Sequence, residues 1–364
     1  MEAFPFFCVS GTAINRGREI GELARNQIIH NIDFYQRYFM NSYGISWESA
    51  TARAKEYIPW IEKYDQEIMD EIKGISEGSE QNLIDIVALN VRSEIINTDG
   101  CTSLAAVPQA ARNNETLLGQ NWDWNDGVKP GVIVLEIDQS PRPAILMATE
   151  AGIVGKIGMN SEGLGVCLNF LGTDDQTTMG VPVHIILRGI LNSRTLSQAT
   201  GQIGRLTRGT SANYLIAHRE GEALNIEATP DDYDVLYSMN GWLIHTNHFI
   251  GPRHINIKDT ARINFPDTHL RQGRASKLLS HANGQIDSET FKTILTDHIG
   301  HPDSICRHGE LFPPDLGRPT VGSTVFSIIM NLSEGLMELS AGQPCSNPYK
   351  TYCFSANKKG ELKK

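Results

Sequence analysis

The sequence predicts an α+β fold, and three observations lead to this prediction. The chain of 364 residues is 40% hydrophobic and 20% charged, an ordinary composition for a globular protein. Apolar residues recur at intervals of three and four over the first hundred residues, which is typical of amphipathic helices. After Gly100, short apolar runs separated by Gly, Asn, Asp and Pro indicate strands joined by tight turns. We therefore expect a helical segment over 1–100 and one α+β unit over 101–364.

The helical segment contains three predicted helices, over residues 14–39, 60–78 and 82–95. The second helix is expected to start after Pro59, because proline is tolerated best at the beginning of a helix. Asn82 is the expected N-cap of the third helix.

The unit over 101–364 is predicted to consist mainly of antiparallel strands. Strands are expected over residues 116–124, 131–138, 144–150, 163–171, 212–218, 222–228, 241–249, 323–332, 335–342 and 349–355. Helices are expected over residues 181–193, 269–282 and 288–299. The sequence contains no repeats, low-complexity tracts or long linkers, so a single α+β unit is expected here.

Charge and cysteine content narrow the class of protein. Forty-two acidic residues against 32 basic ones give a net charge of −10, and such a field repels nucleic acids and anionic membranes. The six cysteines are scattered without a CxxC pair, unlike those of a secreted disulfide scaffold. The chain begins without a signal-peptide pattern, and no apolar run approaches the roughly 20 residues of a membrane span. A cytoplasmic protein is therefore expected.

Cys101 lies at the boundary between the two patterns and has two interpretations. Most cysteines are inert and buried, and Cys101 fits that description. Alternatively, its thiolate attacks the Gly100 carbonyl, and hydrolysis of the resulting thioester leaves Cys101 as a new N-terminus. The released α-amine, with an ordinary pKa of about 7.7–8.0, would then serve as general base for its own thiol.

Three further residues are candidates for the same site. Asp123 in "GQNWDW" is either a turn residue or a carboxylate that orients the Cys101 amine. Asn247 in "GWLIHTNHF" is either a turn residue or an amide donor for an oxyanion. Arg307 in "HPDSICRH" is either a surface charge or an internal cation that faces the site.

His245 and His248 offer a competing chemistry. Residues three apart on a strand point to opposite faces, so a metal ion shared by both histidines is not expected. A Cys101–His dyad of the cysteine-protease type remains open. Phosphate-binding GK[ST] loops are absent from the sequence.

Six motifs in the same order resemble the acyl-coenzyme A:isopenicillin N acyltransferase family of self-cleaving cysteine N-terminal-nucleophile enzymes. They are "TDGCTSL", "LLGQNWDW", "TEAGIVGKIGMNSEGLGVCLNFL", "GVPVHIILRGIL", "IHTNHF" and "SICR". The resemblance implies a four-layer αββα sandwich and cleavage between Gly100 and Cys101. The helical first hundred residues are similar to the small N-terminal chain of that family.

The resemblance also assigns roles to individual residues. Cys101 matches the nucleophile, Asp123 the aspartate of the "NWD" motif, and Asn247 the oxyanion asparagine. Arg307 matches the site arginine of "SICR". Asn169 in "CLNF" resembles the oxyanion asparagine of the related bile-salt hydrolase and penicillin V acylase group.

Two features of the sequence differ from the bile-salt hydrolase and penicillin V acylase group. Gln120 stands where the bile-salt group tends to carry an arginine, and the nucleophile of that group lies near the very N-terminus. Both differences favour the acyltransferase-like family.

The expected function is an autoproteolytically activated cysteine amidohydrolase or acyltransferase that acts on an N-acylated small molecule through a Cys101 acyl-enzyme. Its expected partners are a small-molecule amide and an acyl-CoA, and the two chains are expected to stay associated. No metal or organic cofactor is expected. The alternatives are an acyl-CoA-dependent acyltransferase of the 6-aminopenicillanate or isopenicillin N type, an uncleaved Cys–His hydrolase and a non-catalytic binding protein. The acyl group, the amine and the oligomeric state are left open.

Overall fold

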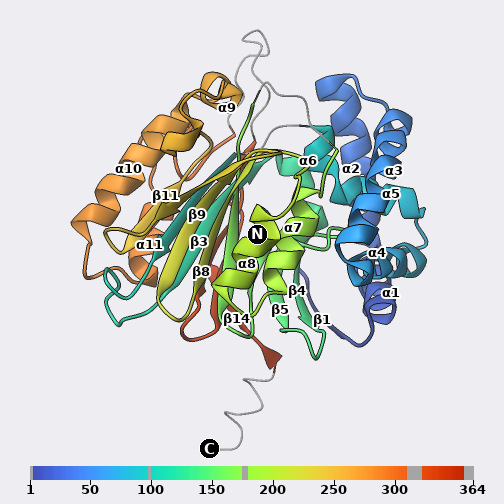
Figure 1. Cartoon of the computed structure of the whole chain (residues 1–364), viewed down its shortest axis with the longest axis horizontal. Helices are drawn as coiled ribbons and strands as arrows, with labels where there is room; N and C mark the ends of the chain where they lie inside the picture. The colour runs from blue at the N-terminus through green and yellow to red at the C-terminus, as the bar shows by residue number, and fades with distance from the viewer. Residues whose placement is uncertain (1–2, 97–99, 174–178, 310–321, 356–364) are drawn as a thin grey trace, which may run out of the picture.

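The computed structural model describes residues 3–96, 100–173, 179–309 and 322–355. Within these ranges the strands form one sheet of eight strands and one of six. The two sheets pack face to face, and helices cover the outer face of each (Figure 1). This four-layer αββα arrangement confirms the predicted fold class.

The eight-stranded sheet has the order β1-β4-β5-β6-β7-β8-β9-β10. Its strands are β1 (Phe6–Ser10), β4 (Val132–Asp138), β5 (Ile145–Glu150), β6 (Ile157–Asn160), β7 (Leu164–Phe170), β8 (Ala212–His218), β9 (Glu222–Ala228) and β10 (Tyr233–Tyr237). Strand β1 runs parallel to β4, and the other neighbours are antiparallel.

The six-stranded sheet has the order β11-β2-β3-β12-β13-β14, and Cys101 lies on β2, next to the edge strand β11. Its strands are β2 (Gly100–Ala106), β3 (Leu117–Trp124), β11 (Trp242–His245), β12 (Ser323–Asn331), β13 (Leu336–Ala341) and β14 (Tyr349–Cys353). All of its pairs are antiparallel.

Two groups of helices form the outer layers (Figure 1). The eight-stranded sheet is covered by α1 (Ala13–Leu23), α2 (Arg25–Tyr43), α3 (Trp47–Tyr64), α4 (Gln66–Ser79), α5 (Leu83–Asn90), α6 (Arg92–Ile95), α7 (Val183–Leu191) and α8 (Leu196–Gly204). The six-stranded sheet is covered by α10 (Asp267–His281) and α11 (Ser288–Leu295), with the short α9 (Thr260–Asn264) before them. Among the described residues, no helix is long and apolar enough to cross a membrane.

The helix boundaries of the first segment differ from the predicted ones. The helix expected over 14–39 is interrupted at Ala24, where φ is −105° and ψ is 18°. Pro59 lies inside α3, which extends to Tyr64, so the expected start after Pro59 is wrong. Asn82 is the N-cap residue of α5 as predicted, but its side chain donates to Asp85 and makes no capping bond to the helix backbone. Tertiary packing of the helix faces therefore outweighs these local signals.

The sequence analysis missed β1, β6, β10, α8, the short α9 and most of α3. Strand β1 is the most informative of them, because it inserts a strand from the first hundred residues beside β4 of the later unit. A five-residue strand without polar alternation gives too weak a periodic signal to be recognised. The first segment is therefore helical with one added strand.

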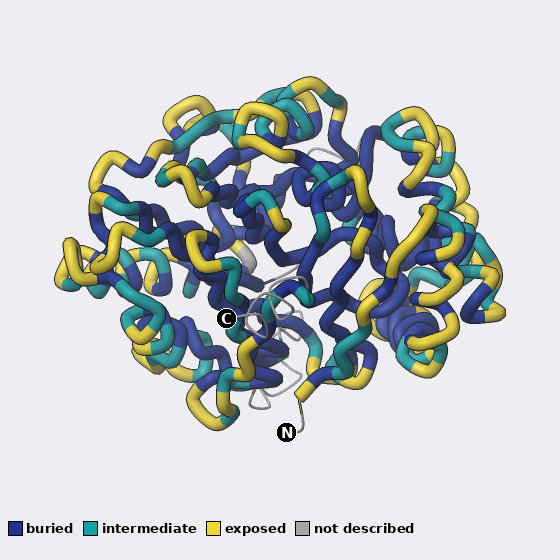
Figure 2. Tube along the Cα trace, turned by 90° about the horizontal axis from the view of Figure 1, so that it is seen from below, coloured by how far each residue is buried: buried dark blue, intermediate teal, exposed yellow. Residues whose placement is uncertain are grey.

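Side chains on β2 alternate between two buried layers. The described residues form a large apolar cluster between the sheets and under α1–α8, and a smaller one beneath α10 and α11. Cys101 and Ala105 belong to the first cluster, while Leu104 and Ala106 belong to the second. Figure 2 shows the buried strands surrounded by exposed outer turns. Cys101 therefore faces the layer between the two sheets.

Buried ion pairs join the helical segment to the later unit. Glu71 on α4 is fully buried and accepts two hydrogen bonds from Arg188 on α7, at 2.6 and 2.8 Å, and one from Arg16. Burial raises the pKa of Glu71, but the two guanidinium groups outweigh burial and hold it below its usual value. Glu150 on β5 is similarly paired with Arg92 of α6. These contacts attach residues 1–100 to the sheets through charge as well as apolar burial.

Replacing Glu71 tests this attachment. We expect Glu71→Ala to lower the free energy of unfolding by about 3–5 kcal/mol, because it leaves Arg188 buried without its carboxylate. Urea unfolding followed by circular dichroism measures the change. The control is Glu77→Ala, whose partner Arg18 and own side chain are 48% and 52% exposed and whose loss should cost less than about 1 kcal/mol. Equal effects of the two variants would contradict the attachment.

Candidate active site

Cys101 lies at the start of β2, between β11 and β3, and is 2% exposed. In the register of β2 and β3, Gly100 faces Asp123 and Cys101 faces Trp122. The antiparallel pairing thus brings together two candidates that are 22 positions apart in sequence. Thr98 and Asp99 of the "TDGCTSL" motif lie outside the described residues.

Asn247 holds the backbone nitrogen of Cys101. The Cys101 N–H donates to Oδ1 of Asn247 over 3.0 Å. The amide nitrogen of Asn247 donates to the carbonyl of Phe170 at 3.1 Å, and its backbone N–H donates to Thr268 at 2.8 Å. The loop after β11 therefore fixes Asn247 against the nitrogen side of Cys101. One hydrogen of its side-chain amide is taken by Phe170, so the other is the one left for an oxyanion.

Asp123 is a fully buried carboxylate on β3, and one of its oxygens already accepts a hydrogen bond. Its Oδ1 accepts a hydrogen bond of 2.7 Å from Thr324. Its Oδ2 lies 3.6 Å from Nε of Arg307, and neither of these two buried atoms has a hydrogen-bond partner among the described residues. Burial raises the pKa of Asp123 to about 6, against the opposing charges of Arg307 and Arg271. Oδ2 of Asp123 can therefore still accept a hydrogen bond.

Arg307 is an internal cation, because only 2% of it is exposed. It donates to Asp303 at 2.8 Å and to Asp267 of α10. Its backbone N–H donates to Thr324, the same residue that binds Asp123. The surface-charge interpretation of Arg307 is therefore wrong.

Asn169 lies on β7, across the layer between the sheets. Its side-chain oxygen accepts from Ser103 at 2.6 Å and from Asn213 at 3.0 Å, and its amide donates to the carbonyl of His245 at 3.2 Å. Ser103 is two positions after Cys101 on the same face of β2. These bonds place Asn169 beneath the strand that carries Cys101, as a residue that fixes β2 and β11.

Arg271 on α10 is a site residue that the sequence analysis missed. Its guanidinium is 1% exposed and donates to the carbonyl of Cys101 at 2.6 Å and to Oδ1 of Asn247 at 3.0 Å. Its Nε donates to Asp267, four residues earlier, at 2.9 Å. The i,i+4 spacing of Asp267 and Arg271 was the available signal, but such pairs are common on exposed helices.

Gly100 is required by close approach to Asp123. A Cβ atom at position 100 would lie 3.1 Å from Cβ of Asp123 and 3.7 Å from its Oδ2. A larger residue would therefore displace the carboxylate. The close packing of Gly100 against Asp123 therefore restricts the size of the residue at position 100.

The two histidines are held by other groups. The ring nitrogens of His245 are bonded to Glu227 at 2.7 Å and to the carbonyl of Thr246 at 2.9 Å. His248 is bonded to Thr268 at 2.9 Å, and burial lowers its pKa to about 3. These partners disfavour either histidine as the base for Cys101.

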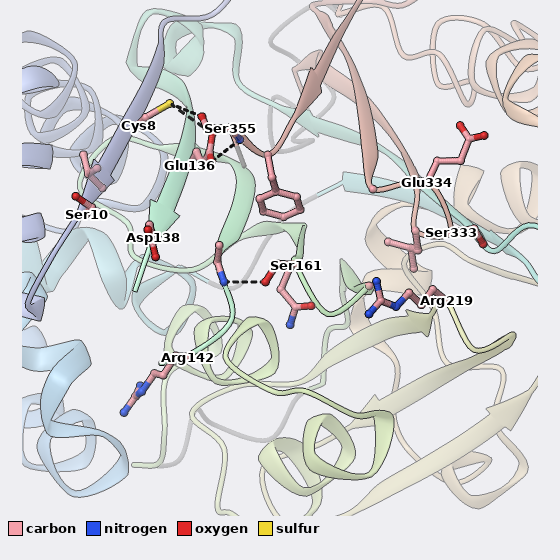
Figure 3. Close-up of a pocket in the computed structure, with 17 residues that line it drawn as sticks. Cys8, Ser10, Glu136, Asp138, Arg142, Ser161, Arg219, Ser333, Glu334 and Ser355 are labelled. Carbon is pink, nitrogen blue, oxygen red and sulfur yellow. Dashed lines mark hydrogen bonds between the residues drawn. The ribbon is translucent and has the colours of Figure 1, made fainter. Parts of the chain in front are cut away.

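A cavity of about 590 Å³ lies elsewhere, between β1, the end of β4 and the turn after β12 (Figure 3). Within it, Glu136 accepts from the backbone N–H and hydroxyl of Ser355 at 2.8 and 2.7 Å. Strand β12 runs from Ser323, opposite Trp124, to Asn331, opposite Leu117. The cavity therefore lies at the end of the sheets opposite to Cys101.

Comparison with known proteins gives consistent matches. A family model described as acyl-coenzyme A:6-aminopenicillanic acid acyl-transferase matches residues 110–345. The chain is 30% identical over 354 residues to the acyl-coenzyme A:6-aminopenicillanic-acid-acyltransferase 40 kDa form of Emericella nidulans, covering 95% of this chain and 94% of that protein.

Solved structures match less closely. A mutant of the conjugated bile acid hydrolase from Clostridium perfringens has a TM-score of 0.48 and 14% identity, covering 70% of this chain and 97% of that chain. Penicillin V acylase from Agrobacterium tumefaciens has a TM-score of 0.45 and 12% identity, covering 66% and 83%.

Asn247 allows a direct test of the predicted oxyanion role. We expect Asn247→Ala to lower turnover roughly 10²–10³-fold, the usual loss for one oxyanion donor. Asn247→Asp, which keeps the acceptor oxygen but lacks the amide donor, should lose activity as well. Turnover of the purified variants is compared with that of Asn331→Ala, at the far end of β12. Turnover of Asn247→Ala within a few-fold of wild type would remove Asn247 from the site.

The histidines are tested separately. We expect His245→Gln and His248→Gln to keep substantial turnover, because both rings are bonded to groups other than the Cys101 thiol. Circular dichroism checks that each variant is folded. Complete loss of turnover in a folded variant would favour the Cys–His hydrolase.

Proposed function

The chain belongs to the family of the acyl-coenzyme A:6-aminopenicillanic acid acyl-transferase, and we propose that it is a self-processing cysteine enzyme. It cleaves or exchanges the acyl group of an N-acylated small molecule. The observation that carries the proposal is the hydrogen bond from the Cys101 N–H to Asn247, with the buried carboxylate of Asp123 opposite Gly100 on the neighbouring strand. This arrangement suits a cysteine whose own nitrogen takes part in the chemistry.

Maturation is proposed to occur at the Gly100–Cys101 bond. The Cys101 sulfur attacks the carbonyl carbon of Gly100, and the C–N bond between the two residues breaks. The nitrogen of Cys101 takes up a proton and becomes an amine, while Gly100 remains as a thioester on the sulfur. Water then hydrolyses the thioester, which yields the Gly100 carboxylate and restores the Cys101 thiol.

The contacts of the first segment support continued association of the two chains. Strand β1 pairs with β4 over five residues, and the ion pair of Glu71 and Arg188 is fully buried. Asn31 of α2 donates to the carbonyls of Gly131 and Ala151. Cleavage at Gly100 breaks none of these interactions.

The cleaved form offers each group a defined role. The Cys101 amine removes the proton of its thiol, and the sulfur attacks the substrate carbonyl. Asn247 binds the amine through Oδ1 and the oxyanion through its amide. Asp123 Oδ2, which has no hydrogen-bond partner among the described residues, accepts from the ammonium form of the amine. Arg271 keeps the Cys101 backbone in place through its carbonyl.

The acceptor of the acyl group defines the reaction. When the amine product leaves, the protonated Cys101 nitrogen supplies its proton, and the acyl group remains on the sulfur. Water as acceptor gives amide hydrolysis, and a second amine gives acyl exchange. The similarity to the Emericella nidulans acyltransferase favours an acyl-CoA donor as the second candidate. We propose a cytoplasmic location for either reaction.

The proposal is tested by the masses of the purified chains. Wild-type protein is expected to give two associated chains, residues 1–100 and 101–364, with Cys101 as the N-terminus of the larger. Cys101→Ala should remain intact and inactive, and Cys101→Ser should be cleaved slowly or not at all, because a hydroxyl is a weaker nucleophile than a thiolate. Intact mass and N-terminal sequencing measure the outcome.

Cys167 provides the matched control. It is a buried cysteine on β7, and burial raises its thiol pKa well above the usual value. Cys167→Ala should therefore still be cleaved. Fully active protein that retains the Gly100–Cys101 bond would overturn the proposed maturation.

A further inference from the structure

Four potential metal ligands converge outside the active site. His298, Cys306 and His308 come from the segment between α11 and β12, and Cys345 lies in the turn between β13 and β14. One ligand atom from each residue lies within 4.8 Å of all the others. The sequence analysis expected no metal and did not consider these four residues together. Cys306 and Cys345 are 39 positions apart and form no CxxC pair.

The separations match a tetrahedral ion. Zinc binds sulfur at about 2.3 Å and imidazole nitrogen at about 2.0–2.1 Å, which separates neighbouring ligand atoms by about 3.3–3.8 Å. Nε2 of His308 lies 3.6 Å from Sγ of Cys306, 3.5 Å from Sγ of Cys345 and 3.0 Å from Nε2 of His298. These three separations are close to those of a tetrahedral shell, and no two of the four ligand atoms are more than 4.8 Å apart.

The donor set selects the class of metal. Two thiolates and two imidazoles are soft and borderline ligands, which favour zinc over magnesium or calcium. Four protein ligands fill a tetrahedral shell and leave no position for substrate, which is typical of a structural site.

We propose that His298, Cys306, His308 and Cys345 bind one Zn²⁺ ion that fixes the segment carrying Arg307. Cys306 and His308 are two positions apart and converge on the ion, while Arg307 between them points the other way, to Asp303 and Asp267. The carbonyl of Arg307 accepts from the N–H of Thr324 at 3.0 Å, next to Asp123. The ion would thus connect the β13–β14 turn to the arginine side of the active site.

The metal content of the purified full-length protein tests this proposal. After dialysis against metal-free buffer, we expect about one zinc ion per protein molecule by inductively coupled plasma mass spectrometry. Cys345→Ser and His298→Gln change two exposed ligands, so the variants should fold and bind zinc roughly tenfold or more weakly. Cys8→Ser, an exposed cysteine, and His301→Gln, whose ring centroid is 5.3 Å from that of His308, should retain zinc.

Cobalt gives a second readout that does not depend on activity or on chain cleavage. Protein stripped of metal and refilled with Co²⁺ should show the visible absorption of a tetrahedral thiolate site, and Cys345→Ser should lose it. Wild-type protein that binds neither zinc nor cobalt would overturn the proposal. A Cys306–Cys345 disulfide in metal-free native protein, or loss of zinc in His301→Gln, would overturn it as well. Failure of cleavage at Gly100 would leave these measurements unchanged.

Discussion

The arrangement around Cys101 depends on one buried guanidinium, that of Arg271. It donates to the Cys101 carbonyl, to the side-chain oxygen of Asn247 and to Asp267. These bonds join the six-stranded sheet, the loop after β11 and the outer helix α10. Arginine suits this position because its donors are spread over a rigid plane and it stays charged when buried. A lysine ammonium is a single point of charge, so it could not reach the same partners in this geometry. Cys101, Asn247 and Asp267 are therefore positioned by one side chain.

The same guanidinium belongs to a charge network that treats its two nearest carboxylates differently. Burial raises the pKa of Asp267, but Arg271 and Arg307 outweigh burial and lower it, so Asp267 stays ionised. Asp123 receives weaker compensation, and burial raises its pKa to about 6. The network thus leaves Asp123 more readily protonated than Asp267.

The sequence predicted the parts of this site that short motifs carry. Local sequence named the Gly100–Cys101 step, Asp123, Asn247 and Arg307 as candidates, and the family resemblance gave them roles. The change from helical periodicity to short apolar runs at Gly100 predicted the α+β class. Arg271 could not be recognised, because its role depends on which face of α10 meets the start of β2. Strand β1 was missed for a related reason, since its parallel pairing with β4 joins residues 128 positions apart. The role predicted for Asn169 as an oxyanion residue remains a prediction. Its side-chain bonds to Ser103, Asn213 and His245 arise from packing between the two sheets, which local sequence does not reveal.

The segment 306–308 explains how two separate structural tasks share three consecutive residues. Within this segment, Cys306 and His308 lie on the side of Cys345, while Arg307 reaches the buried carboxylate of Asp267. Arg307 is held from its own side by Asp267 and Asp303, and its backbone is bonded to Thr324 in both directions. Rotation of this backbone would move Arg307 away from Asp123 and would separate Cys306 from His308 together. A restraint on the side chains of Cys306 and His308 therefore acts directly on the orientation of Arg307. The coupling does not have to pass through other parts of the fold.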